Sequence, residues 1–435
     1  MSQPTRGAGR HSRWHRWTVA IAALSLVVQV SACGGSDDDS STATTEGTGT
    51  TASAADLLGP ADQASGEPVK IGMVSDGATQ AYDNTDELRA AQATAKYWNE
   101  HKGGVGGRPI EVVTCETHGD PAGATDCGNQ FVEKGVVAVT LSNSAVADSV
   151  WPPLHDAGIP AFFFQYNGGD VLNDAKASFV MQNPLATLFG VPISAAHAVD
   201  ADRIDFIIID IPIALTAFES GDAKKILDKA GLDYDLIKIP IGTADMTAQM
   251  QQVVNNGAGA VQIIGNDAFC IAAINGLAAV GFDGAIATVV QCITDATRQG
   301  VPNGGLKGVS ISATQAVGDQ SDTAYQRYLA VMSTYGQDVE DVPSAITMGG
   351  YTAMASLAAS LGGISGDITP TSVAETIRSM QEADFPGADG ITFKCGGSAY
   401  PPQPAVCTNE SLRATLNADG QPDKYELVDS TDILP

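Results

Sequence analysis

The sequence predicts an α/β protein made of two doubly wound parallel-sheet lobes, and three observations support this. The chain has 435 residues, more than a single hydrophobic core usually organises. From residue 69 onward, short and continuously apolar runs alternate with helix-like stretches, which is typical of parallel strands covered on both faces. The alternation ends near residue 164 and starts again near residue 203, so two successive βα series are expected.

The N-terminus has the pattern of an exported protein. Four arginines precede an apolar stretch over 17–30, which is too short for a comfortable membrane span but suits a signal-peptide core. The stretch ends in Val30-Ser31-Ala32-Cys33, which resembles a bacterial lipobox, in which the cysteine is acylated and the preceding peptide removed. We therefore expect a lipoprotein signal peptide over 1–32 and a lipidated Cys33 that anchors the chain to the outer face of the cell membrane. The alternative is an ordinary secretory signal with a chance cysteine.

Residues 33–66 are expected to form a disordered tether between the lipid and the folded body. They are rich in Ser, Thr, Ala, Gly and Asp and contain almost no aromatic or branched apolar side chain. Such a segment cannot bury enough apolar surface to offset the entropy lost on ordering.

The elements of the folded body follow in two series. In the first we expect strands at 69–74, 110–114, 136–141 and 161–164, with helices at 86–101, 122–134 and 149–156. In the second we expect strands at 203–209, 236–239, 260–264 and 285–290, with helices at 216–230, 247–255 and 270–280. A further strand at 308–313 and helices at 321–335, 344–361 and 370–380 suggest that the chain then returns to the first lobe.

Cysteine usage fits an oxidising compartment. If Cys33 carries lipid, six cysteines remain, and they fall into three couples that are close in sequence. Six thiols can pair in many ways, but the three local couples predict disulfides Cys115–Cys127, Cys270–Cys292 and Cys395–Cys407. The alternative interpretation is that these cysteines bind a metal. No CxxC spacing and no HxxxH pair near a carboxylate occur in the mature sequence, so no metal is expected.

Charge and missing motifs exclude several classes of function. The formal net charge is −27, and removal of residues 1–32 would leave −31, which argues against nucleic acid or anionic lipid as a ligand. The glycine-rich segment 103–107 precedes a strand instead of following one, so it indicates a turn and not a dinucleotide site. Phosphate-loop and nucleophile-elbow motifs are also missing from the sequence, so we expect neither an enzyme nor a cofactor.

Several short motifs occur along 67–435 in a characteristic order. They are Val69-Lys70-Ile71-Gly72, Tyr97-Trp98-Asn99-Glu100, the turn at 103–107 before Arg108-Pro109, Asp120-Pro121-Ala122, Ala157-Gly158-Ile159-Pro160, Gly350-Tyr351-Thr352-Ala353, Thr369-Pro370, and the segment 387–393. Their order and spacing resemble the branched-chain amino acid-type (leucine/isoleucine/valine-binding-like) substrate-binding lipoproteins of ABC transporters, which have the type I periplasmic-binding fold.

This resemblance implies two lobes joined by three crossovers, with a ligand cleft between them. Carried onto this chain, lobe 1 comprises 67–181 plus 314–383, and lobe 2 comprises 182–313 plus 384–435. It also implies capture of a small-molecule ligand by hinge closure and delivery to ABC permease subunits, with no covalent chemistry. We expect a monomer.

Ligands of doubly wound sheets bind beyond the carboxyl ends of the strands, and this rule selects loops in both lobes. Loop by loop, the candidate residues are Gln80 and Tyr82; Ser142, Asn143 and Ser144; Gln165, Tyr166 and Asn167; Asp210; and Asp267. The resemblance assigns the serines, with backbone N–H groups, to a ligand carboxylate, a geometry that suits an anion at a helix N-terminus. The alternative is that they cap only their own helix.

Three departures from the family pattern weaken the case for a branched-chain α-amino acid as the ligand. Gln165-Tyr166-Asn167 replaces a short Thr/Ser/Ala stretch, so Tyr166 would stack on a ring, pack over an apolar tail, or be a buried structural tyrosine. Ile211-Pro212-Ile213 replaces the usual aromatic wall after Asp210. The loop at 291–294 lacks the acid expected to bind an ammonium group, leaving Asp267, which could equally be a helix cap.

The sequence thus predicts a lipid-anchored extracytoplasmic solute-binding protein of an ABC importer. Its ligand would be amino acid-like, an amide, or a carboxylate or aromatic compound. The main alternative is a ligand sensor of the same fold that acts on a membrane signalling partner. A surface structural or adhesive protein is a third class, which would need no cleft.

Overall fold

The computed structural model describes residues 53–79, 82–142, 144–166 and 168–435. The predicted signal peptide, Cys33 and the first part of the predicted tether lie outside these residues. The last part of the predicted tether is folded. Helix α1 (Ala54–Leu58) begins with a capping box between Ser53 and Asp56, and Leu58 is buried among side chains of the first lobe. The expectation of disorder up to residue 66 is therefore wrong for this part, because two leucines supply enough apolar surface to dock it.

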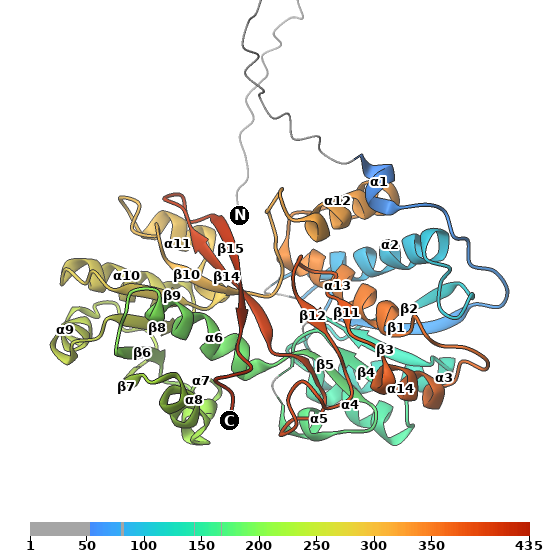
Figure 1. The fold of residues 1–435 in the computed structure, drawn as a ribbon, viewed down its shortest axis with the longest axis horizontal. Coiled ribbons are helices and arrows are strands. Elements are labelled where there is room, and N and C mark those ends of the chain that lie inside the picture. The colour runs from blue at the N-terminus through green and yellow to red at the C-terminus, as the bar shows by residue number, and fades with distance from the viewer. Residues whose placement is uncertain (1–52, 80–81, 143, 167) are drawn as a thin grey trace, which may run out of the picture. The chain divides into compact units, whose positions relative to one another are not determined.

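The first lobe contains a fully parallel six-stranded sheet with the order β13-β5-β4-β3-β1-β2 (Figure 1). Its strands are β1 (Val69–Ser75), β2 (Ile110–Glu116), β3 (Ala138–Leu141), β4 (Ala161–Phe163), β5 (Ser178–Gln182) and β13 (Val406–Thr408). The helices of this lobe are α1, α2 (Thr85–His101), α3 (Pro121–Lys134), α4 (Ala147–Asp156), α5 (Gly169–Asn173), α12 (Thr323–Tyr335), α13 (Ala345–Ser360) and α14 (Pro370–Ser379). A small antiparallel pair, β11 (Ala383–Asp384) and β12 (Thr392–Phe393), completes it.

Both faces of this sheet are covered, as its continuous apolar strands predict. Successive side chains of a strand point to opposite faces. Val139 and Leu141 accordingly pack in one cluster with Phe131 of α3, whereas Ala138 packs in another with Met354 of α13. Residues that would be exposed in a one-sided sheet are therefore apolar here, and the period-2 pattern disappears from the sequence.

The second lobe contains a seven-stranded sheet with the order β15-β14-β10-β9-β8-β6-β7. Its strands are β6 (Arg203–Ile209), β7 (Asp233–Ile239), β8 (Ala260–Ile264), β9 (Ala285–Thr288), β10 (Ser310–Ala313), β14 (Glu410–Leu416) and β15 (Pro422–Asp429). Its helices are α6 (Pro184–His197), α7 (Pro212–Glu219), α8 (Asp222–Ala230), α9 (Thr247–Asn256), α10 (Asp267–Ala279) and α11 (Asp295–Gly300), with a short 3-10 turn η1 (Val290–Cys292). The strands β6 to β10 are parallel, and β14 and β15 are antiparallel additions.

The element boundaries differ from the sequence expectation in two informative places. The helix expected over 216–230 is two helices, because Gly221 adopts a left-handed conformation (φ 80°) between α7 and α8. The return to the second lobe was expected at residue 384, but β13 still pairs with β5 in the first sheet and only β14, from Glu410 onward, lies in the second. Short strands such as β13 lack a periodic signal, so sequence alone does not place them.

The chain crosses between the two sheets three times, and each crossing starts at the carboxyl end of a strand. Asn183 leads from β5 into α6, residues 314–322 lead from β10 into α12, and Asn409 leads from β13 into β14. Buried amides tie the crossings together: Asn183 Nδ2 donates to Asn409 Oδ1 over 2.9 Å, and Gln182 Nε2 donates to the Thr314 carbonyl over 3.4 Å. The carboxyl edges of the two sheets therefore meet along these crossings.

All three disulfides expected from the local couples are present. Cys115–Cys127 joins β2 to α3, Cys270–Cys292 joins α10 to η1, and Cys395–Cys407 joins the segment after β12 to β13. No helix among the described residues is long and apolar enough to span a membrane.

Candidate functional site

A buried aspartate organises the carboxyl edge of the first sheet. Asp76 directly follows β1 and is 2% exposed. Its carboxylate accepts hydrogen bonds from Ser144 Oγ (2.6 Å), Thr117 Oγ1 (2.7 Å), the Ala145 N–H (2.9 Å) and the Tyr82 hydroxyl (3.0 Å). Burial opposes ionisation, but these four hydrogen bonds hold the pKa of Asp76 below its ordinary value. Asp76 is thus a carboxylate at neutral pH, and it joins the loops after β1, β2 and β3.

Two predicted ligand contacts, Tyr82 and Ser144, are partners of this carboxylate. The Tyr82 ring is 40% exposed, so its face can still meet a ligand although its hydroxyl is bonded. The Ser144 hydroxyl donates to Asp76 and also accepts from the Val146 N–H at the start of α4. Ser144 therefore stabilises the loop before α4, but it is not the N-cap of this helix, which is Val146 and has no side-chain cap.

Ser142 lies beside a second buried acid, Glu87 in the first turn of α2. Ser142 is 4% exposed and Glu87 is 1% exposed, and the Ser75 hydroxyl donates to Glu87 Oε2 over 2.7 Å. Burial raises the pKa of Glu87 to about 8, although hydrogen bonds with Ser75 and Ser142 act in the other direction. Glu87 is therefore mostly a neutral acid at pH 7. Its role could not be seen in the sequence, where it stands among the ordinary acids of a helix N-terminus.

Side-chain contacts within the protein hold the loop after β4 in place. Tyr166 donates its hydroxyl to Asp148 of α4, and its ring packs against Phe163 with centroids 4.8 Å apart. Gln165 Nε2 donates to Thr314 Oγ1 over 3.3 Å, which links this loop to the second crossing between the lobes. Tyr166 is thus bonded within the protein but is half-buried, unlike the buried tyrosine of the structural alternative, and Gln165 is bonded to the second crossing.

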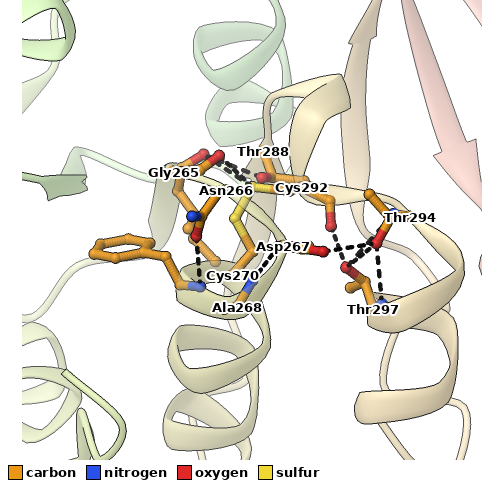
Figure 2. Close-up of a disulfide and its surroundings, with 11 residues drawn as sticks. Gly265, Asn266, Asp267, Ala268, Cys270, Thr288, Cys292, Thr294 and Thr297 are labelled. Atoms are coloured by element: carbon orange, nitrogen blue, oxygen red, sulfur yellow. Dashed lines mark hydrogen bonds between the residues drawn. A yellow bond between two sulfur atoms is a disulfide. The ribbon is translucent and has the colours of Figure 1, made fainter. Parts of the chain in front are cut away.

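In the second lobe, Asp210 and Asp267 follow the neighbouring strands β6 and β8. Asp210 is exposed, and its carboxylate makes no hydrogen bond within the described residues. Asp267 is half-buried at the start of α10, where its carboxylate accepts from the Ala268 N–H (2.7 Å) and the Thr294 hydroxyl (3.4 Å) (Figure 2).

The Cys270–Cys292 disulfide lies beneath the second-lobe rim, the loops that follow β8 and β9, and both cysteines are fully buried. Thr297 donates its hydroxyl to the Cys292 carbonyl over 2.5 Å, and Asn266 caps α10 by accepting from the Phe269 N–H (Figure 2). The loops after β8 and β9 therefore form one connected platform that carries Asp267.

Three of the predicted contacts, Gln80, Asn143 and Asn167, lie outside the described residues, as does Cys33. The structure brings the other seven to the carboxyl edges of the two sheets, as the strand-end rule predicted. The rule selects the loop that contains Asp76, but it does not predict that Asp76 and Thr117 connect the loops. An aspartate placed directly after a buried strand is the one signal that could have identified Asp76.

One surface hollow of about 630 Å³ lies between α3 and α4, lined by residues that include Thr125, Asn129 and Asp148. None of the predicted ligand residues that the structure describes lines it. Within the described residues, no group of three or more His, Cys, Asp or Glu side chains could hold a metal ion.

Comparison with known proteins relates this fold to a family. The profile of the family described as periplasmic binding protein matches residues 68–404. No curated protein matches the sequence.

Solved structures that resemble this one have similar descriptions. The branched-chain amino acid transporter substrate-binding protein LivJ from Streptococcus pneumoniae, in complex with isoleucine, is 16% identical, with 83% of this chain and 99% of that chain covered (TM-score 0.60). An ABC transporter substrate-binding protein from Sphaerobacter thermophilus is 18% identical, with 85% and 100% covered (TM-score 0.64). A fatty acid ABC transporter substrate-binding protein from Thermomonospora curvata is 17% identical, with 85% and 94% covered (TM-score 0.56). At such identities the likeness concerns the fold and not the ligand.

Proposed function

This chain belongs to the periplasmic binding protein family, and we propose that it is the lipid-anchored receptor of an ABC importer, capturing a small organic solute between its lobes. The family resemblance seen in the sequence is thereby confirmed, and the proteins it resembles bind substrates and are not enzymes. The observation that carries the proposal is topological: three crossings join the carboxyl edges of two parallel sheets, where ligands of such sheets bind.

Closure of the two lobes on a ligand supplies the mechanism. A ligand that touches loops of both lobes makes its full set of contacts only in the closed state, so it shifts the equilibrium toward closure. The crossings at Asn183, 314–322 and Asn409 are the segments that would absorb the change in backbone angles. Tyr82 from the first lobe and Asp210 and Asp267 from the second would face the ligand.

Ligand-induced stabilisation of the purified protein tests the binding role. A ligand at about 100 times its dissociation constant should add about 2.7 kcal/mol to the free energy of unfolding, which raises the melting temperature measurably. The panel should contain amino acids, amides, carboxylates and aromatic compounds, after bound ligand is removed by unfolding and refolding. Small-angle scattering should show compaction with the same compound. A protein that responds to no compound in either measurement would contradict the proposal.

Transport and sensing are separated by an uptake assay in the source cells. Deletion of the gene should abolish uptake of the radiolabelled ligand if the protein serves an importer. Unchanged uptake, with loss of a transcriptional response to the ligand, would favour the sensor alternative.

Lipid anchoring is tested at Cys33. The full-length chain should incorporate radiolabelled palmitate and sediment with membranes, and Cys33→Ser should abolish both. The cysteines paired in the folded body offer a control, since the Cys395→Ala/Cys407→Ala double variant should still be labelled. A Cys33→Ser chain that remains labelled would contradict the assignment.

A further inference from the structure

The donors expected to hold a ligand carboxylate are already occupied by a carboxylate of the protein. The loop directly before α4, whose N-cap is Val146, presents the Ser144 hydroxyl and the Ala145 N–H as two donors for an anion. Asp76 accepts from both, at 2.6 and 2.9 Å, and also from Thr117 and Tyr82. Asp76 therefore fills this anion site from within the chain, and a ligand carboxylate would meet a like charge in place of free donors.

No cationic side chain in the surrounding loops could compensate for the negative charge of Asp76. The segments that connect the carboxyl end of each described strand of the two sheets to the next helix or strand contain no lysine and no arginine, whereas several contain aspartate. Their one histidine, His118, lies 3.8 Å from Glu116 and 3.2 Å from the Ala78 carbonyl. The carboxyl edges of both sheets are thus electrostatically unfavourable for an anion.

The same edges expose apolar side chains. Among the described residues, Tyr82 is 40% exposed after β1, Ile346 is 47% exposed at the start of α13, Ile241 is 68% exposed after β7 and Val290 is 49% exposed after β9. The start of α13 belongs to this edge because Gly350 packs against the backbone of Glu87 and Gly349 packs against Ser142. Exposed apolar groups from both lobes suit a ligand with a sizeable apolar part.

The second lobe offers partners for a positive charge. Asp210 is exposed and its carboxylate has no hydrogen-bond partner within the described residues. Asp267, at the start of α10 (Figure 2), follows β8, which pairs with β6. We propose that the ligand is an apolar amine that lacks a carboxylate, with its ammonium group bound by Asp210 and Asp267 and its apolar part packed against Tyr82, Ile346, Ile241 and Val290. This inference rests on the proposed binding function and specifies its ligand class.

A matched series of small compounds tests the proposal on the unmodified protein. The series compares leucine, leucinamide, 3-methylbutylamine and 4-methylpentanoate, together with larger apolar amines and their carboxylate counterparts, by calorimetry and thermal shift. The expected result is that amines and amino amides bind at least tenfold more tightly than the matched amino acids and acids. Equal or tighter binding of leucine or of any matched acid would overturn the inference while leaving the proposed function intact. Absence of binding by the amines would overturn the inference as well. If no compound of the series binds, acids included, the result would also count against the proposed function.

A variant tests the role of Asp76 directly. Asp76→Asn removes the charge from the donors in the loop before α4 with little change in shape, so affinity for 4-methylpentanoate should rise at least tenfold. Glu133→Gln is the matched control, since it removes one negative charge from an exposed position near the C-terminal end of α3. An Asp76→Asn protein that folds but gains no affinity for acids would overturn the inference. If this variant does not fold, the compound series decides alone.

Discussion

At the scale of single residues, the hydrogen bonds of Asp76 hold three loops of the first lobe together. Ser144 and Tyr82 follow buried strands, and the structure places them at the carboxyl edge of the first sheet as expected. Their hydroxyls turn inward to Asp76, whose burial depends on three loops that are more than 25 residues apart along the chain. Such a network is created by folding and leaves no local signal in the sequence.

Loss of one donor to Asp76 should destabilise the protein. Thr117→Val keeps the shape of the side chain but removes a 2.7 Å hydrogen bond to a buried carboxylate. Hydrogen bonds to charged groups contribute about 1.5–3 kcal/mol, so the free energy of unfolding should fall by that amount in urea titrations. Thr125→Val, at an exposed position of α3, is the control and should change it by less than about 0.5 kcal/mol. Equal effects of the two variants would refute the prediction.

Glu87 should make stability depend on pH in a defined direction. Its pKa is about 8 in the folded protein, against an ordinary value of 4.5. Between these values the unfolded chain releases a proton that the folded chain keeps, so stability falls as the pH rises, by up to about 1.4 kcal/mol per pH unit. Glu87→Gln has no such proton. Relative to the parent, the variant should therefore gain free energy of unfolding as the pH rises from 5 to 8. A difference that stays constant over this range would show that Glu87 is ionised in the folded protein.

At the scale of elements, close packing of α2 against α13 explains a sequence feature that periodicity does not. The helix expected over 344–361 is present as α13, but Gly349 and Gly350 lie in its interior, where glycine normally weakens a helix. A side chain at Gly350 would place its Cβ 2.1 Å from the Glu87 carbonyl oxygen. The two glycines thus allow the backbones to approach, an effect that depends on the partner helix and is hidden in one sequence.

Gly350→Ala should be strongly destabilising although alanine favours helices. The Cβ would meet backbone atoms of α2, which cannot move aside as a flexible side chain could, and overpacking of this kind costs about 1–3 kcal/mol. Thermal and urea unfolding measure the effect. Gly363→Ala is the control, since a Cβ there has no atom within 4 Å. A neutral effect of Gly350→Ala would mean that the two helices pack less closely.

The disulfide beneath the second-lobe rim should stabilise its platform of loops. Replacing both partners, as Cys270→Ala with Cys292→Ala, opens a loop closed over 22 residues, for which the chain-entropy account gives roughly 3 kcal/mol. Hydrogen exchange should show faster opening of η1 and of the first turn of α10. Peptide mapping of the non-reduced parent should recover the Cys270–Cys292 pair, and a different pairing would contradict the structure.

At the scale of the whole molecule, the three crossings decide how the lobes are composed. β13 belongs to the first sheet and β14 to the second, although only Asn409 separates them. The side chains of Asn183 and Asn409 pair at 2.9 Å within the protein, and both are buried. Two crossings far apart in sequence are therefore joined by a direct hydrogen bond.

Breaking the hydrogen bond between Asn183 and Asn409 should lower the free energy of unfolding and loosen the two crossings. Asn409→Ala leaves the buried Asn183 amide without its partner, which costs about 1–3 kcal/mol. Urea unfolding should show the loss, and hydrogen exchange should increase at the start of α6 and of β14. Asn255→Ala, at an exposed position near the end of α9, serves as the control. An Asn409→Ala protein as stable as the control would show that the pair contributes nothing to stability.

The sequence by itself determined the fold class, most of the parallel strands and their helices, and the disulfide pairs. These depend on local patterns: continuous apolar runs, helix caps and cysteines close along the chain. Only the tertiary structure decided that residues 53–66 dock, that β13 stays in the first sheet, and that Asp76 occupies the donors expected for a ligand. Each of these depends on contacts between segments far apart in sequence, whose strength comes from burial and from shared hydrogen bonds that exist only after the chain has folded.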